Sequence, residues 1–241
     1  MDSAKRQWLT AIGGASAGLI LTACIKGSSS DSENKKDENA KGGEVTATED
    51  LMREHVVLRR ALLVYSAVAS KLRNGGSNIS PDALTQTAKL FRSFGEEYHE
   101  KKLEEAYIFP AVKNAGGPAA ALPDILIAQH NRGREITDYI IAVTNSGKLS
   151  GATEALASAL ESFVLMYRNH AAREDTIIFP AWKQTMSAKQ LDEIGDKFEE
   201  IEQQQFGKDG YEDAVKQISD IEGMLGLSDL AQFTAPPPPS S

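Results

Sequence analysis

Four long segments of this chain carry apolar residues at alternating spacings of three and four, the repeat of one face of an α-helix. The segments are residues 48–73, 80–115, 123–144 and 152–183. Only short stretches separate them, so consecutive helices are expected to run antiparallel. The sequence therefore predicts an all-α fold, an antiparallel up-down four-helix bundle.

The same repeat predicts which side chains face the core of the bundle. The predicted inward residues are Leu51, His55, Leu58, Leu62, Tyr65, Ala69 and Leu72 in the first helix; Leu84, Ala88, Phe91, Tyr98 and His99 in the second; Leu126, His130, Gly133, Thr137, Ile140 and Thr144 in the third; and Leu156, Leu160, Phe163, Tyr167, His170, Glu174 and Ile177 in the fourth.

Capping residues mark where two of the predicted helices begin. Ser80 precedes Pro81 and Asp82, a combination that caps a helix, suits its first turn and complements its dipole. Ser187 opens a further helix in the same way, and a short helix is expected at residues 211–224. We therefore expect additional C-terminal helices that pack on the outside of the bundle.

The first 24 residues differ in character from the rest. After the basic residues Lys5 and Arg6, residues 8–23 form an uncharged stretch rich in Ala, Gly and Leu that ends at Cys24. This stretch is shorter than the roughly 20 residues of a membrane span and fits a signal peptide. Residues 21–24 resemble the lipobox of bacterial lipoproteins, which implies cleavage before Cys24, the single cysteine, and its lipidation.

The export route and the location follow from the same segment. Residues 3–9 resemble a twin-arginine signal in which Lys5 replaces the first arginine, so both Sec and twin-arginine export stay open. A lipidated Cys24 predicts a protein of the cell envelope, anchored to a bacterial membrane on its periplasmic or extracytoplasmic face.

Composition divides the chain into five parts. Residues 25–46 contain almost no apolar side chains and cannot bury enough surface to fold, and the prolines at 236–239 form a stiff, extended tail. The predicted parts are the signal peptide (1–23), the lipidated cysteine with a disordered tether (24–46), the bundle (47–185), a helical extension (186–232) and a disordered proline-rich tail (233–241).

The net charge of the chain limits its partners. The formal charge is −8 at pH 7, and no cluster of Lys and Arg stands out. A nucleic-acid partner is therefore not expected, because binding to phosphates calls for a basic surface.

The chain has four histidines, and each predicted bundle helix contains one of them: His55, His99, His130 and His170. Each lies on or beside the inward stripe. A single inward histidine is usually a core residue with satisfied hydrogen bonds. Four such histidines, one in each helix, would arise by chance on the order of once in several hundred, taking the stripe as about 3/7 of each helix. The set therefore predicts a metal centre inside the bundle.

An internal repeat in the second and fourth helices adds carboxylates to this prediction. In both helices an acidic pair is followed by the sequence Ile-Phe-Pro-Ala, and Glu104 and Glu174 occupy the same place before the proline. Two inward carboxylates in an apolar core would be costly without a cation. Glu104 and Glu174 are therefore predicted metal ligands.

The two repeats differ in the spacing between histidine and glutamate. His170 and Glu174 are four residues apart and point the same way one helical turn apart. His99 and Glu104 are five apart and would diverge by about 140° in a regular α-helix. We predict a π-bulge between them. Without it, Glu100 or Glu105 would serve in place of Glu104.

Over about residues 50–182 the chain resembles the hemerythrin-like, or HHE cation-binding, family. The resemblance rests on His55 in the sequence Asp-Leu-Met-Arg-Glu-His, on residues 99–110, on His130 in Ile-Ala-Gln-His-Asn and on residues 170–180. It implies a four-helix bundle that holds two non-haem irons.

The resemblance also implies a role for each predicted ligand. Glu104 and Glu174 would bridge the two irons, and the terminal ligands would be His55, His99, His130 and His170. Imidazole and carboxylate ligands without thiolate suit iron, with manganese or zinc as alternatives.

Arg134 departs from the pattern of the oxygen-carrying members, which have a fifth histidine at this place, four residues after the one on the third helix. Either one metal has a more open coordination sphere, or Glu135 substitutes, or only one metal binds tightly. The departure disfavours reversible carriage of dioxygen and favours redox reactivity.

Two classes of function follow from such a centre. The first is binding or sensing of O₂, NO or iron itself, without turnover. The second is an oxidoreductase that reduces O₂ or peroxide, or repairs damaged metal centres, with electrons from outside. A metal-free structural bundle is the third alternative. Binding is preferred because no residue stands out as a general acid or a nucleophile, so the sequence leaves open whether the protein is an enzyme.

Overall fold

The computed structural model describes residues 45–75, 79–145, 147, 149 and 153–239 of the chain. The predicted signal peptide, Cys24 and all but the last two residues of the predicted tether lie outside this part. Within the described residues there are helices and no strands, which confirms the predicted all-α fold. None of the described helices has the length and apolar character that crossing a membrane would require.

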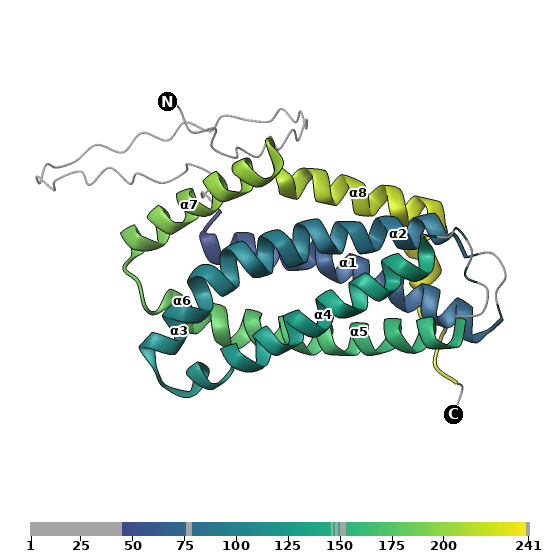
Figure 1. The fold of residues 1–241 in the computed structure, drawn as a ribbon, viewed down its shortest axis with the longest axis horizontal. Coiled ribbons are helices and arrows are strands. Elements are labelled where there is room, and N and C mark those ends of the chain that lie inside the picture. The colour runs from purple at the N-terminus through teal and green to yellow at the C-terminus, as the bar shows by residue number, and fades with distance from the viewer. Residues whose placement is uncertain (1–44, 76–78, 146, 148, 150–152, 240–241) are drawn as a thin grey trace, which may run out of the picture. The chain divides into compact units, whose positions relative to one another are not determined.

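Four helical arms make up the bundle (Figure 1). The first arm is α1 (Ala47–Arg73). The second runs through α2 (Pro81–Leu90), the π-helical segment η1 (Phe91–Ile108) and α3 (Phe109–Ala115). After the short 3-10 turn η2 (Pro118–Ala121) comes the third arm, α4 (Pro123–Thr144). The fourth arm runs through α5 (Thr153–Arg173), the π-helical turn η3 (Glu174–Ile178) and α6 (Phe179–Lys183). Each arm packs on two others, so that α1 lies between the second and fourth arms, and so does α4.

Further helices follow the bundle, as predicted. Helix α7 (Ala188–Phe206) packs on α1 and η1, and α8 (Gly210–Leu225) packs on α1 and α2 (Figure 1). The indole of Trp182 stacks on Phe198 at 5.8 Å, and Arg60 pairs with Glu222 across α1 and α8. After the 3-10 turn η4 (Leu230–Phe233), residues 234–239 are exposed and form no helix.

Both predicted capping residues act as caps. The Ser80 hydroxyl accepts a hydrogen bond from the backbone N–H of Ala83, and Pro81 lies in the first turn. The side chains of Ser187 and Gln190 accept from each other's backbone N–H groups, which forms a capping box. Each such cap stabilises its helix by about 1 kcal/mol.

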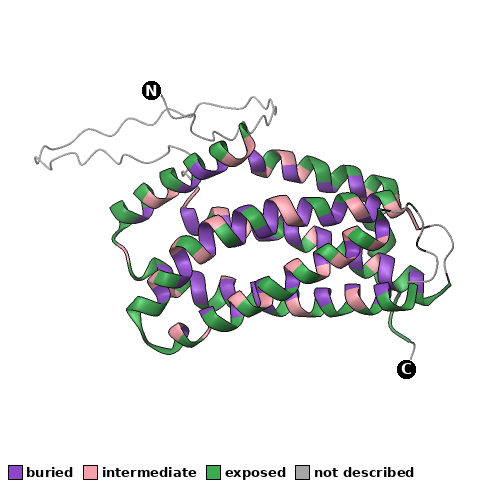
Figure 2. Cartoon of the chain, viewed as in Figure 1, coloured by how far each residue is buried: buried purple, intermediate pink, exposed green. Residues whose placement is uncertain are grey.

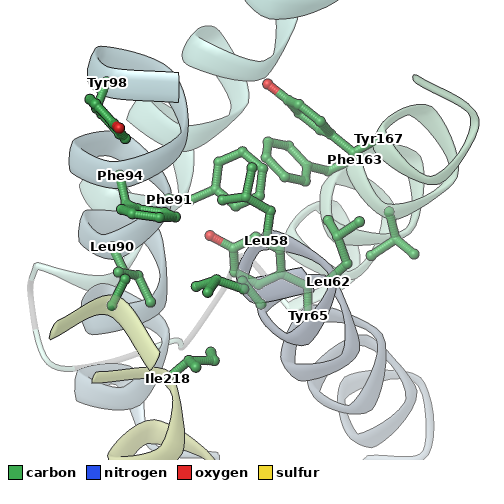
Figure 3. Packing of buried hydrophobic residues seen from close by; sticks show 14 of the residues in the cluster. Leu58, Leu62, Tyr65, Leu90, Phe91, Phe94, Tyr98, Phe163, Tyr167 and Ile218 are labelled. Atoms are coloured by element: carbon green, nitrogen blue, oxygen red, sulfur yellow. The ribbon is translucent and has the colours of Figure 1, made fainter. Parts of the chain in front are cut away.

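The core consists of the inward faces of the arms, which Figure 2 shows as buried stripes beside exposed outer faces. Figure 3 shows Phe91, Phe163 and Tyr167 gathered beside Leu58. The Phe163 ring centroid is 4.9 Å from that of Phe91 and 4.6 Å from that of Tyr167. Burial of each of these side chains contributes about 1.5–3 kcal/mol. The Tyr167 ring in turn lies 5.4 Å from His170, so this aromatic cluster borders the histidines.

The π-bulge predicted between His99 and Glu104 is present as part of a longer π-helical segment. The segment η1 extends from Phe91 to Ile108, and at its end the backbone N–H of Phe109 donates to the carbonyl of Glu104, five residues back. A π-helical segment turns less per residue than an α-helix, so a spacing of five brings both side chains to the same face.

The predicted inward residues are all buried except Ile177, which is 41% exposed, whereas Ile178 is fully buried. The prediction for Ile177 was wrong because the fourth arm also contains a π-helical turn, η3. There the backbone N–H of Phe179 donates to the carbonyl of Glu174, five residues back. The extra residue in this turn shifts the inward position from 177 to 178.

Candidate metal centre

The six predicted ligands meet in the interior of the bundle, and each is at most 3% exposed. All four arms contribute to the group: His55 from α1, His99 and Glu104 from η1, His130 from α4, His170 from α5 and Glu174 from η3. The structure thus brings together all the residues that the sequence singled out. Their role as ligands stays a prediction.

The imidazoles form two pairs. Nε2 of His55 is 3.0 Å from Nε2 of His99, and Nε2 of His130 is likewise 3.0 Å from Nε2 of His170. We call the space beside the His55 and His99 nitrogens the first position, and the space beside the His130 and His170 nitrogens the second position.

Each carboxylate directs one oxygen to each position. Glu104 places Oε1 3.3 Å from His99 Nε2 and Oε2 3.4 Å from His130 Nε2. Glu174 places Oε2 3.5 Å from His55 Nε2 and Oε1 2.9 Å from His170 Nε2. Both positions are therefore faced by two imidazole nitrogens and two carboxylate oxygens.

These separations suit metal coordination. With bonds of about 2.0–2.2 Å, neighbouring ligands at roughly tetrahedral or octahedral angles lie about 2.8–3.6 Å apart. The measured separations of 2.9–3.5 Å between neighbouring ligand atoms agree with this. The six residues would therefore hold two ions without a rearrangement of the arms.

The oxygens of Glu104 and Glu174 supply an independent indication of a cation. All four oxygen atoms are buried, and none accepts a hydrogen bond within the described part of the chain. A buried, unpartnered carboxylate is costly unless a cation neutralises it or the group takes up a proton. The residues present therefore fit bound metal ions.

A second layer of side chains orients the imidazoles. Each Nδ1 atom lies 2.5–2.9 Å from an oxygen of another side chain: His55 from Asp175, His99 from Glu54, His130 from Glu105 and His170 from Gln129. Because these partners are carboxylate or amide oxygens, each Nδ1 carries the proton and donates it. Each Nε2 then faces the centre, where a bound metal would take the place of any proton that the nitrogen carries.

These four hydrogen bonds form a closed ring around the bundle. In each case the acceptor comes from a neighbouring arm: α1 supports the histidine of η1, η1 that of α4, α4 that of α5, and η3 that of α1. Each arm therefore supplies one imidazole and orients another.

The electrostatics of the centre favour positive charge in its middle. Burial alone would lower the pKa of His99 and of His130, yet the surrounding carboxylates raise the first well above its ordinary value and the second to about 10. Burial would raise the pKa of Glu104, but His99 and His130 hold it well below its usual range. By contrast, burial lowers the pKa of His55 to about 3. The ionised Glu104 carboxylate thus attracts cationic charge.

Glu100 and Glu105, the alternatives to Glu104, lie in the outer layer. Glu100 Oε1 accepts from the Tyr167 hydroxyl at 2.7 Å. Arg134 donates to both acids, at 3.1 Å to Glu100 and 2.5 Å to Glu105. The side chain at the place of the fifth histidine is thus bonded to outer carboxylates.

Glu135 cannot replace the fifth histidine. Its side chain is 64% exposed and pairs with Arg132 at 2.6 Å on the outer face of α4. The interpretation of Glu135 as a substitute ligand was therefore wrong. Two interpretations of Arg134 remain: one metal has a more open coordination sphere, or only one metal binds tightly.

A small pocket with room for about one water molecule adjoins the centre. The lining includes five of the six predicted ligands, and the remaining wall is formed by Leu58, Leu62, Phe91, Tyr167, Ala171, Arg59 and Glu100. Tyr167 fits because α4 has a glycine opposite its ring: a Cβ on Gly133 would come within 2.0 Å of the hydroxyl. A small molecule in this pocket would lie against both the ligands and an apolar wall.

The sequence did not reveal the outer layer, although a signal for it was present. Glu54, Glu105, Gln129 and Asp175 each stand next to a predicted ligand in the chain. A neighbour on a helix is rotated by about 100°, so it faces the adjoining arm. Polar residues adjacent to buried ligands were therefore the usable signal.

Comparisons with known proteins agree with this geometry. A family model described as the hemerythrin HHE cation binding domain matches residues 46–182. Proteins of Mycobacterium tuberculosis and Mycobacterium bovis, described as uncharacterized, are 37% identical over 233 residues, which is 95% of this chain and 90% of theirs. No solved structure matches the chain significantly.

Proposed function

Because the chain belongs to the hemerythrin HHE cation-binding family, we propose that it is a non-haem diiron protein of the cell envelope that binds or senses O₂, NO or iron. The family and the buried group of histidines and glutamates together indicate metal binding. The proposal goes beyond these two findings in three respects: the identity of the metal, the small ligand and the location.

One observation carries the proposal above the others. Glu104 and Glu174 each direct one buried, unpartnered oxygen to each of two imidazole pairs. A single ion would use only half of these oxygens. Two ions would use all four, with Glu104 and Glu174 holding both ions and one pair of imidazoles holding each.

The donor set supports iron. Imidazole and carboxylate ligands without thiolate suit iron, while manganese and zinc accept the same donors. Iron bound here would supply the ability to bind or reduce a small oxygen- or nitrogen-containing ligand. The protein holds the ligands in place through the Nδ1 hydrogen bonds, and Leu58, Leu62 and Phe91 give the pocket an apolar wall.

The proposal is tested by the metal content and spectrum of the full-length chain. Purified without oxygen and loaded with Fe(II), it should retain two irons per chain and develop ultraviolet and visible absorption on exposure to air. A band that is stable and reverses on removal of oxygen would support binding. A chain that retains no stoichiometric metal would refute the proposal and leave the structural bundle.

An oxidoreductase that reduces O₂ or peroxide is the second candidate, and the pocket favours it in one respect. The Tyr167 hydroxyl lines the pocket and donates to Glu100, which Arg134 also holds. A phenol that is hydrogen-bonded to a carboxylate could pass a proton to a reduced ligand, although burial raises the pKa of Tyr167 well above its ordinary value. Sustained consumption of peroxide by the iron-loaded protein, with a supplied reductant, would favour this candidate over binding.

The location rests on residues outside the described part of the chain. The uncharged stretch before Cys24 and the polar segment after it support export and a lipid anchor. Mass spectrometry of the mature protein should find a lipidated Cys24 as the first residue. An unprocessed N-terminus would contradict this part of the proposal without affecting the metal centre.

A further inference from the structure

The two metal positions have equivalent inner ligands but different outer layers. On the inside, each is faced by two imidazole nitrogens and by one oxygen each of Glu104 and Glu174. With Arg134 at the place of a fifth histidine, the inner ligands give no reason to prefer either position. Any difference in affinity has to come from the residues behind the imidazoles.

Behind the first position, both imidazoles donate to carboxylates. His99 Nδ1 lies 2.5 Å from Glu54 Oε2, and Glu54 is 1% exposed. The other oxygen of Glu54 accepts from the Tyr98 hydroxyl at 3.0 Å. His55 Nδ1 lies 2.7 Å from Asp175, which also pairs with the half-exposed Arg59.

Behind the second position, one of the two acceptors is neutral. His170 Nδ1 donates to the amide oxygen of Gln129 at 2.9 Å. His130 Nδ1 donates to Glu105 at 2.9 Å and lies 3.9 Å from Glu100, and Arg134 pairs with both acids. An arginine therefore offsets the charge of Glu105, as Arg59 offsets that of Asp175 behind the first position. The two positions differ at the remaining pair, Glu54 behind His99 and Gln129 behind His170.

A carboxylate behind an imidazole draws its Nδ1 proton away and makes Nε2 a stronger electron donor to a metal. A neutral amide oxygen attracts the Nδ1 proton less, so it strengthens Nε2 less as an electron donor. We infer that the two positions are unequal, that the position of His55 and His99 binds a divalent cation first and more tightly, and that Glu54 and Gln129 set the difference. This inference rests on the proposed two-metal centre.

The test is a stepwise titration of the metal-free, full-length chain with Co(II), a metal whose visible absorption reports its ligands. The wild type should take up two ions in two separate steps, with affinities that differ by about tenfold to a hundredfold, the usual effect of an outer partner. Two indistinguishable steps would overturn the inference. No uptake would refute the two-metal centre itself, which separates the two failures.

Two substitutions, one that removes a negative charge and one that adds one, show which step of the titration belongs to which position. Glu54→Gln keeps an oxygen acceptor near His99 but removes its charge, and should weaken the first step about tenfold or more while leaving the second. Gln129→Glu adds a charge behind His170 and should strengthen the second step, so that the two steps merge. Glu135→Gln, the same chemical change at an exposed site on α4, is the matched control and should leave both steps as they are.

The pattern of changes decides the outcome. Weakening of the second step by Glu54→Gln, or an unchanged titration in both variants, would contradict the inference. Circular dichroism and thermal unfolding of the metal-free variants establish that the bundle is intact. Should Glu54→Gln fail to fold, Gln129→Glu alone still distinguishes the outcomes, because a second step that stays weak with a glutamate behind His170 would overturn the assignment.

Discussion

The two acidic segments of the centre, residues 99–110 and 170–180, reach the same arrangement by different helical routes. In the second arm, π-helical geometry covers Phe91–Ile108, and His99 and Glu104 are five residues apart. In the fourth arm only Glu174–Ile178 is π-helical, and the spacing from His170 to Glu174 is four. In both arms, the phenylalanine that follows is bonded through its backbone N–H to the glutamate carbonyl five residues back.

The comparison teaches that the helix type compensates for the sequence spacing. A regular α-helix in the second arm would turn Glu104 away from His99, and the wider helix returns it. The segments also differ three residues before the histidine, where the second arm has the buried acid Glu96 and the fourth arm has Tyr167. Four sets of substitutions test which of these features matter.

The largest effect is expected at the two glutamates that both segments share. Glu104→Gln or Glu174→Gln should each reduce metal content by at least tenfold, because each carboxylate faces both positions. Without metal, Glu104→Gln should also be less stable than the metal-free wild type by about 3–5 kcal/mol, because the cationic forms of His99 and His130 lose the carboxylate that they neutralise. Metal analysis and urea unfolding measure the two effects. Unequal loss of metal in the two variants would show that the segments are not equivalent.

The next effect tests the π-helical turn of the fourth arm. Ile178→Ala should destabilise the protein by about 2–5 kcal/mol, because Ile178 is fully buried. Its neighbour Ile177 is 41% exposed, so Ile177→Ala should change stability by less than about 0.5 kcal/mol. Denaturant unfolding of this matched pair measures both. The reverse order would contradict the burial of Ile178 in the core and the exposure of Ile177.

A pH-dependent effect is expected from Glu96, the acid that only the second arm contains. Burial raises the pKa of Glu96 to about 7, with Thr137 and Arg92 partly opposing it. The folded state therefore holds on Glu96 a proton that the unfolded state has released between about pH 4.5 and 7, so the contribution of Glu96 to stability falls as the pH rises through this window. His55, whose pKa burial lowers to about 3, contributes in the opposite sense, so the contribution of Glu96 is read from the difference between the wild type and a variant. At about 1.4 kcal/mol per pKa unit the loss reaches about 3 kcal/mol.

The measurement is urea unfolding of the metal-free protein from pH 4.5 to 8. Glu96→Gln should remove most of this slope, and Glu97→Gln, on the exposed side of η1, should retain it. An identical slope in the wild type and in Glu96→Gln would assign the pH dependence to other groups.

The smallest effect concerns Tyr167, the counterpart of Glu96 in the fourth arm. Gly133→Ala should cost about 1–3 kcal/mol, because the added Cβ would come within 2.0 Å of the Tyr167 hydroxyl. Tyr167→Phe removes that oxygen and should recover part of the loss in the double variant. Thermal unfolding of the single and double variants measures the coupling, and purely additive losses would argue against direct contact.

The bundle could be predicted because its core positions follow one period. Leu51, Leu58 and Leu62 are buried as their spacing indicates, and His55 lies in the same stripe. Ile177 failed because a π-helical turn shifts the register by one residue without changing the apolar composition around it. The spacing of five residues between His99 and Glu104, against four between His170 and Glu174, was the one feature of the sequence that revealed the wider helix.

The inner layer of the centre could be predicted for a different reason. The chain has only four histidines, and their distribution over four helices left few arrangements. Polar residues next to the ligands pointed to an outer layer, but its pairings could not be predicted, because Glu54 and Gln129 orient histidines on other arms. Such pairings depend on which arms are neighbours and on how each arm is rotated about its axis. The apolar period of a single helix gives no information on either.

The ring of hydrogen bonds around the histidines has a consequence for the order of assembly. The last bond, from His55 on the first arm to Asp175 on the fourth, forms only after the chain has returned to its starting helix. A nascent or truncated chain that lacks the fourth arm would present misdirected imidazoles. Stable binding of the proposed metal ions would therefore come only after the whole bundle has closed. Proteolytic fragments that lack an arm should not bind the metal.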